Sequence, residues 1–187
     1  MPNTKITTLG DALMVKLRAL YDIESELVKA LPKMAKKSTD SALMEAFESH
    51  LDETKMHVDR LEQSFKLLDM KASKLKTEGI RGIIADAEWA IKEKPGKEAL
   101  DSMLIAAASY AEHYEIAGYT AAVKWARMLG NDDVANLLEE TLKEEEMADD
   151  TLQTLAGEGI DDRAMAMIGE DGDGMSEDEE EATDDEE

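Results

Sequence analysis

Two glutamates stand in the middle of apolar helical stripes, where a carboxylate is an unusual residue. If each residue of a helix advances by about 100°, Glu24 shares its face with four leucines, and Glu115 of AEHYEIAGY (111–119) shares its face with one leucine and three alanines. An ionised carboxylate in such a place costs several kcal/mol unless another group compensates its charge. The apolar neighbours within about 40° are Leu13, Leu17, Leu20 and Leu31 for Glu24, and Leu104, Ala108, Ala111 and Ala122 for Glu115.

Both glutamates belong to a repeat that divides the chain into two similar halves. Glu24 and Glu115 are 91 residues apart, and apolar pairs on either side of them keep the same offset. The segments HLDETKMH (50–57) and LLEETLKE (137–144) also match, with His57 aligned to Glu144. Each half therefore has one helix with a glutamate at the centre of its stripe, followed by a helix with a mixed cluster of polar ligand-type side chains.

Carboxylates that converge from several helices in a poorly solvated interior repel one another. Protonation or a bound multivalent cation relieves this repulsion, and carboxylates mixed with imidazole suit iron or manganese. A single glutamate of this kind is more often a boundary residue with its head group in water, but four helices in a twofold repeat favour a metal centre. The candidate ligands are Glu24, His50, Glu53, His57, Glu112, Glu115, Glu144 and Glu145, with Glu140 at the margin of the cluster.

The helices that would carry these residues follow from the 3.6-residue period of the apolar positions. Short links predict two antiparallel helical hairpins, and a long connection (71–97) predicts a crossover between them. The expected helices cover about 8–36, from a cap at 38–41 to about 70, a short one near 78–92, 97–129, and 131 to about 156. This pattern predicts an all-α, ferritin-like four-helix bundle with a short fifth helix in the crossover.

Charge divides the chain into a body and a tail. The net charge is −23, and residues 157–187 contain fifteen acidic residues and one arginine. We expect residues 1–156 to form the bundle and residues 157–187 to form an acidic, disordered tail. No basic face is available for nucleic acid. The chain has no cysteine, no signal-peptide pattern and no apolar run that could span a bilayer, so a soluble, cytoplasmic protein is expected.

Six segments of the sequence resemble the YciE/YciF-type stress-associated ferritin-like proteins, which are distant relatives of rubrerythrin. The resemblance covers roughly residues 7–156, and its combination of AEHYEIAGY with ALPKM in this order is specific. The acidic tail is not part of it. The matching segments are LYDIESELVKALPKM (20–34), FESHLDET (47–54), RLEQSF (60–65), EGIRGII (78–84), LIAAASYAEHYEIAGY (104–119) and LLEETLKEEEMADDTL (137–152).

The resemblance implies a ferritin-like bundle, often a homodimer, with a di-iron centre that binds Fe(II) and oxidises it with O2 or peroxide. By position, Glu24 resembles the ligand of the first helix, and Glu112 and Glu115 resemble the paired carboxylates of the third. Glu144 and Glu145 resemble the carboxylates of the fourth helix, and the second helix contributes His50 within the family's HL-x-x-T segment.

One departure from ferritin-like di-iron proteins concerns the Glu-x-x-His spacing, which those proteins use on two helices and which this chain lacks. Glu53 and His57 are instead four residues apart, on one face of a helix.

Together, the converging carboxylates and the resemblance predict an iron-binding, ferroxidase-like protein that limits oxidative damage under stress. The alternatives are a non-catalytic stress-response scaffold that has lost its metal site, and a bundle that consumes peroxide with manganese.

Overall fold

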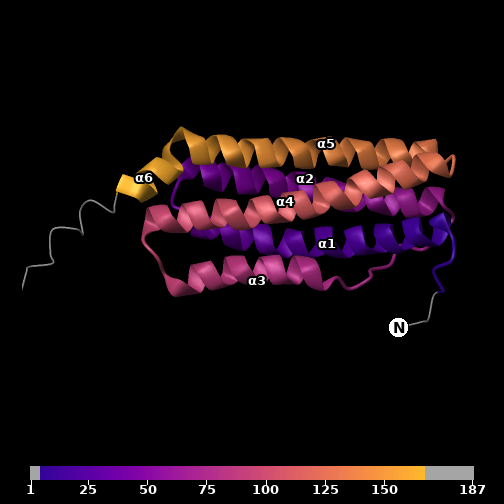
Figure 1. Ribbon diagram of the computed structural model, residues 1–187, viewed down its shortest axis with the longest axis horizontal. Coiled ribbons are helices and arrows are strands. Elements are labelled where there is room, and N and C mark those ends of the chain that lie inside the picture. The colour runs from indigo at the N-terminus through magenta and orange to yellow at the C-terminus, as the bar shows by residue number, and fades with distance from the viewer. Residues whose placement is uncertain (1–4, 167–187) are drawn as a thin grey trace, which may run out of the picture.

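The computed structural model describes residues 5–166 of the chain, and these residues form helices and no strands (Figure 1). Helices α1, α2, α4 and α5 pack as a four-helix bundle, and α3 lies along α1 and α4 on the outside. The expected ferritin-like bundle with a fifth helix in the crossover is confirmed. The elements are α1 (Leu9–Lys37), α2 (Ser41–Leu67), α3 (Glu78–Glu93), α4 (Lys97–Met128), α5 (Asp132–Leu155), the turn η1 (Ala156–Ile160) and α6 (Asp161–Ala166).

The beginnings of the helices follow local capping chemistry. Thr8 and Asp11 form a reciprocal capping box at the start of α1. The side chain of Asp40 accepts hydrogen bonds from the first backbone amides of α2. Asn131 stands at the N-cap position of α5, at the expected start of this helix, but its side chain forms no capping hydrogen bond.

The ends of α2 and α4 are set by residues in the left-handed region. Gly130, with φ of 73°, follows α4, and the amide of Asn131 returns to the carbonyl of Ala126 at 2.9 Å. Helix α2 ends at Leu67, three residues earlier than predicted. The reason is that Asp69 adopts φ of 53°, a conformation that stops a helix and that the sequence did not signal.

Helix α3 is held against α1 by a buried carboxylate, Asp22. Its oxygens accept hydrogen bonds from the Thr77 amide at 2.8 Å and from Arg81 at 2.7 Å. Burial alone would raise the pKa of Asp22, but the hydrogen bonds from Arg81 and Thr77 outweigh it and lower the pKa to about 2. The crossover is therefore anchored to the bundle at the first turn of α3.

Helices α1 and α4, which carry the two stripe-centred glutamates, approach closely. A Cβ on Gly118 would lie 2.9 Å from Leu20 Cδ2, so a larger residue there would displace the side chain of Leu20. Leu20 and Tyr119 beside it are fully buried. The close packing fixes the register between the helices that bring Glu24 and Glu115 to the same level of the bundle.

After Gly157 the chain turns at Glu158 and Gly159, where φ of Gly159 is 119°, and then forms the short helix α6. Ile160 is 3% exposed and joins the core, and Arg163 forms an ion pair with Asp40 at 2.6 Å. Residues on the C-terminal side of the expected boundary at 157 thus contact the bundle through Ile160, Asp161 and Arg163. The acidic run at the end of the predicted tail lies outside the described residues. Within residues 5–166 no helix combines the length and apolarity needed to cross a bilayer.

Candidate metal centre

Six of the eight predicted ligands meet in the interior of the bundle. Glu24 comes from α1, His50 and His57 from α2, Glu112 and Glu115 from α4, and Glu145 from α5. Four of them, Glu24, His57, Glu115 and Glu145, have no exposed surface, while Glu112 and His50 are 3% and 7% exposed. The apolar period placed Glu24 and Glu115 on stripes that face the core, and the structure also buries the other four residues.

One set of ligand-type atoms, here called the inner group, consists of Glu24, His57 and Glu145. The Nδ1 atom of His57 lies 3.0 Å from Glu145 Oε1 and 3.5 Å from Glu24 Oε2. Neither contact has hydrogen-bond geometry for this nitrogen. One donor atom from each residue lies within 4.8 Å of the other two, which is close enough for all three to bind one ion.

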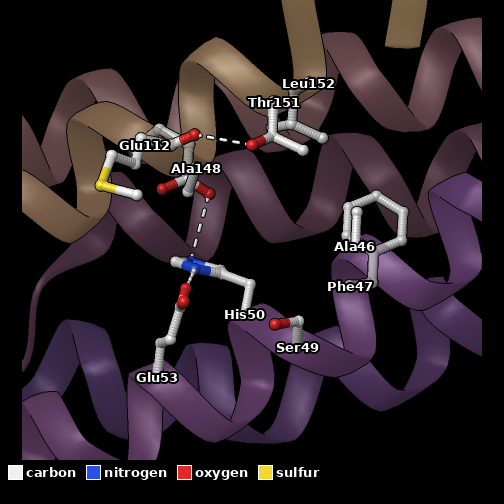
Figure 2. A pocket seen from close by; sticks show the side chains of 10 residues that line it. Ala46, Phe47, Ser49, His50, Glu53, Glu112, Ala148, Thr151 and Leu152 are labelled. Carbon is white, nitrogen blue, oxygen red and sulfur yellow. Dashed lines mark hydrogen bonds and ion pairs between the residues drawn. The ribbon is translucent and has the colours of Figure 1, made fainter. Parts of the chain in front are cut away.

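A second set, the outer group, consists of His50, Glu112 and Glu145. The Nε2 atom of His50 lies 3.4 Å from Glu112 Oε1 and 3.6 Å from Glu145 Oε2. Figure 2 shows the imidazole of His50 between the carboxylates of Glu112 and Glu53. Glu145 offers one oxygen to each group, so it stands between the two possible ion positions.

Six carboxylate oxygens of this cluster have no hydrogen-bond donor within the described residues. Among residues 5–166, Glu24 Oε2, Glu112 Oε2 and both oxygens of Glu115 and of Glu145 are buried without a hydrogen-bond partner. Such atoms are rare in native proteins, since each costs about 1–3 kcal/mol, more if charged. Buried, unpartnered carboxylate oxygens beside two imidazoles are donors that suit divalent cations such as iron or manganese, so the residues present fit a metal centre.

Burial and mutual repulsion raise the pKa values of three of these carboxyls. Burial is the largest cause for Glu115, Glu112 and Glu145, and the charge of Glu145 adds to it for the other two. The pKa of Glu145 itself rises to about 7 because burial and the charge of Glu24 outweigh the opposing effect of His57. Without a cation, protons therefore neutralise part of the cluster.

The pKa values of the two histidines are raised as well, although burial acts on an imidazole in the opposite direction. Burial acts to lower the pKa of His57, but the carboxylates of Glu145 and Glu24 beside it outweigh burial and raise the pKa to about 11. Burial likewise acts to lower the pKa of His50, but the charge of Glu112 and the contact with Glu53 together outweigh it and raise the pKa. A divalent cation in either group would replace this protonic charge with its own.

Glu144 lies behind His57 rather than inside the cluster. Its Oε2 atom accepts from His57 Nε2 at 2.8 Å, and both of its oxygens accept from the buried guanidinium of Arg60, one at 2.9 Å. Although partial burial acts to raise its pKa, the hydrogen bonds from Arg60 and His57 lower it. The structure thus separates Glu144 and Glu145, which the sequence grouped together.

The remaining candidates lie at the edge. The side chain of Glu53 is 42% exposed, and its Oε2 atom is 3.3 Å from His50 Nδ1. Glu140 is 59% exposed and pairs with Arg60 at 2.9 Å. Glu53 can therefore reach the outer group only through His50 in this arrangement, and Glu140 reaches neither group.

Two residues that contact the candidate ligands were not predicted from the sequence. Tyr119 is fully buried, and its hydroxyl donates a hydrogen bond to Glu24 Oε1. It follows Glu115 by one helical turn, so its place on the same stripe was a usable signal. Arg60 follows His57 by three residues and contacts Thr141 as well as Glu144. Its spacing from His57 was visible, but its inward direction depends on the partner helix.

Comparisons with known proteins agree with this architecture. A family described as "Domain of unknown function (DUF892)" matches residues 8–165. Protein YciF of Escherichia coli strain K12 is 35% identical over 158 residues, which cover 84% of this chain and 95% of that protein. The crystal structure of the E. coli stress protein YciF matches with TM-score 0.80 and 34% identity, over 83% of this chain and 99% of that one. YcfI from Rhodopseudomonas palustris matches with TM-score 0.80 and 38% identity, over 82% of this chain and 98% of its own. The resemblance to YciF-type proteins is thus confirmed, and the chain belongs to the DUF892 family.

Proposed function

We propose that this protein binds two Fe(II) ions inside the bundle and oxidises them, as a ferritin-like ferroxidase. The observation that carries the proposal is the position of Glu145, whose two oxygens face separate groups of donor atoms while neither has a hydrogen-bond partner. A carboxylate that is buried in this way is stabilised by a pair of cations, one on each oxygen.

The two groups provide the ligands for the two ions. Glu24, His57 and Glu145 of the inner group would hold one ion, and His50, Glu112 and Glu145 of the outer group would hold the other. Glu115 adds a carboxylate from the same helix as Glu112, and the charges of Glu24, Glu112 and Glu145 all act on it. Bound iron supplies one-electron redox chemistry that no protein side chain of the cluster provides.

The reaction needs two electrons for each molecule of oxidant. Each Fe(II) gives one electron, and O2 accepts two electrons and two protons to become hydrogen peroxide. With peroxide as the oxidant, two electrons and two protons yield two molecules of water. The protein's part is to hold both ions beside a shared carboxylate in a nearly dry space, so that the two electrons are available together.

A chain of polar contacts behind His57 supports its role as a ligand. Arg60 keeps Glu144 ionised, and Glu144 accepts a hydrogen bond from His57 Nε2. This contact directs Nδ1 of His57 toward Glu24 and Glu145 and favours a lone pair on that atom when an ion binds. Glu144 then acts as a positioning residue and not as a ligand.

The proposed biological role is protection against iron-driven oxidation. The relative YciF is described as a stress protein, and removal of Fe(II) together with an oxidant would protect a stressed cell. The cytoplasm, where Fe(II) is kept reduced, is the proposed location. A homodimer is the proposed assembly, which light scattering after gel filtration would test.

An anaerobic titration tests the function directly. Fe(II) is added to the metal-free protein in steps, and air is then admitted while near-ultraviolet absorbance follows the formation of Fe(III). We expect saturation at about two iron ions per chain and oxidation well above the rate in buffer. Glu145→Gln removes the shared carboxylate and should abolish both, whereas the exposed neighbour Glu146→Gln is the matched control and should leave both unchanged.

A second candidate function is a non-catalytic stress-response scaffold. It is favoured by the missing Glu-x-x-His spacing and by Arg60, which already neutralises Glu144. Iron binding no stronger in the wild type than in Glu145→Gln would support the scaffold and overturn the ferroxidase. A manganese-dependent, peroxide-consuming bundle would use the same ligands, and elemental analysis of the purified protein distinguishes it.

A further inference from the structure

A pocket opens onto the outer group but not onto the inner group. Its volume is about 120 Å³, and it lies between α2 and α5, with His50 and Glu112 at its inner end (Figure 2). Exposed residues such as Met147 and Thr151 line its mouth. Glu24, His57 and Glu115 do not line it and have no exposed surface. The two groups therefore differ in their access to solvent.

The size and walls of the pocket restrict what can pass through it. Sites for organic ligands usually measure about 300–1,000 Å³, so this pocket suits a few waters, a divalent cation or a small inorganic oxidant. Phe47, Ala148 and Leu152 form apolar walls. These three side chains offer a cation no ligand, so a cation in the pocket depends on its polar residues, which include Glu53, His50 and Glu112.

Glu53 provides a charged group on this path. Its carboxylate is 42% exposed, lines the pocket and lies 3.3 Å from His50 Nδ1. An acidic side chain at the mouth of a low-dielectric passage raises the local concentration of cations. Glu53 is therefore placed to receive a cation from solvent before it contacts the outer group.

We propose that the outer group exchanges its divalent ion through this pocket, while the inner group is closed and retains its ion. This inference rests on the proposed function, because it requires both groups to bind metal. It assigns two inequivalent positions, a rapidly exchanging one at His50, Glu112 and Glu145 and a slowly exchanging one at Glu24, His57 and Glu145. The pocket is the path of the divalent-cation substrate, and Glu53 is its first contact.

Release of Co(II) to a chelator tests the inference without any reaction turnover. The protein is loaded with two equivalents of Co(II), mixed rapidly with excess EDTA, and followed by the visible absorbance of cobalt. The wild type should lose its cobalt in two phases of equal amplitude, with rates at least tenfold apart. His50→Ala should lose the fast phase and keep the slow one, with circular dichroism confirming that it folds.

A second variant narrows the pocket without changing a ligand. Ala148 is half-buried on the α5 wall, so Ala148→Phe should slow the fast phase at least tenfold while the capacity for two ions and the slow phase stay unchanged. Ala106→Phe introduces the same side chain on the exposed face of α4, away from the pocket, and should behave like the wild type.

The possible results separate the two proposals. Two ions released in a single phase, or a fast phase that Ala148→Phe leaves unchanged, would overturn the exchange path while leaving the metal centre standing. No specific cobalt binding by the wild type would overturn both. Two phases with only the faster one sensitive to Ala148→Phe would support the path.

Discussion

At the scale of single residues, Glu115 lies in surroundings that strongly disfavour an ionised carboxylate. It has no exposed surface, neither of its oxygens has a hydrogen-bond partner among residues 5–166, and burial raises its pKa well above the usual range. A group that destabilises the metal-free fold and gains a cation when metal binds is a typical compromise between stability and function.

Replacement of Glu115 by methionine should therefore stabilise the metal-free protein. Methionine keeps the length of the side chain and removes the buried polar atoms, so we expect a gain of about 1–4 kcal/mol in the free energy of unfolding. Chemical denaturation measures it. Glu146→Met on exposed α5 surface is the control and should change stability by less than about 0.5 kcal/mol. A loss of stability in Glu115→Met would show that the carboxylate supports the fold.

Glu144 should affect metal affinity without changing the number of ions bound. Glu144→Gln removes the anionic acceptor behind His57, so we expect about 10–100-fold weaker binding of Co(II) with two ions still bound per chain. Competition with a chromophoric chelator measures the affinity. Glu140→Gln, which also contacts Arg60 but not His57, is the control. A drop to one ion per chain would instead identify Glu144 as a ligand.

The residue scale also shows why one part of the site could be predicted and another could not. Glu24 and Glu115 lie at the centre of their apolar stripes, so the helical period alone predicts that they face the core. Glu144 and Glu145 are adjacent, about 100° apart, and both lie near a stripe. The rotation of α5 against α2 and the reach of Arg60 decide which of them faces the cluster, and neither follows from the spacing.

At the scale of elements, α2 supplies an imidazole to both groups. His50 and His57 are seven residues apart, two turns along one face, so each reaches a different level of the bundle. Their rings lie 6.2 Å apart. The twofold repeat of carboxylates was visible in the sequence, but the histidines break it, since α5 has glutamate where α2 has His57. The division into an inner and an outer group depends on this asymmetry.

The link between α1 and α3 should be sensitive to acid. The pKa of Asp22 is lowered to about 2 in the folded protein, so its ionised form stabilises the fold at neutral pH. This contribution is lost as the pH falls from about 4 through 2. We expect Asp22→Asn to lower the free energy of unfolding by about 1–3 kcal/mol at pH 7. The difference from wild type should shrink below pH 4, and a difference that stayed constant with pH would contradict this role.

At the scale of the whole molecule, the packing of residues 157–166 bears on where the folded unit ends. Ile160 is buried, so a chain that stops after residue 156 should lose about 2–5 kcal/mol relative to one that stops after residue 166. The segment 167–187 carries twelve acidic residues and no basic one. Its removal should leave the melting temperature and the ion stoichiometry unchanged and lower the solubility. Equal stability of the two truncated chains would place the boundary at residue 157.

The bundle as a whole was predictable because its signals are redundant. Caps, stripes and connection lengths all indicated two hairpins and a crossover, and an error of three residues at the end of α2 did not alter the topology. The packing of Ile160 was not predictable, because a single isoleucine among acidic residues does not form a repeating apolar pattern. The pocket beside His50 was likewise hidden, since it depends on how α2 and α5 meet.

A crystal structure after anaerobic soaking with Fe(II) is the most direct test of the central claim. Anomalous scattering at the iron edge should show two peaks, each within about 2.0–2.5 Å of one oxygen of Glu145, a range typical of oxygen ligands. Glu24 and His57 should complete one site, and His50 and Glu112 the other. If no peak appears between these helices and ordered waters or a neighbouring cation instead satisfy the oxygens of Glu145 and Glu115, the protein is a helical scaffold without iron chemistry.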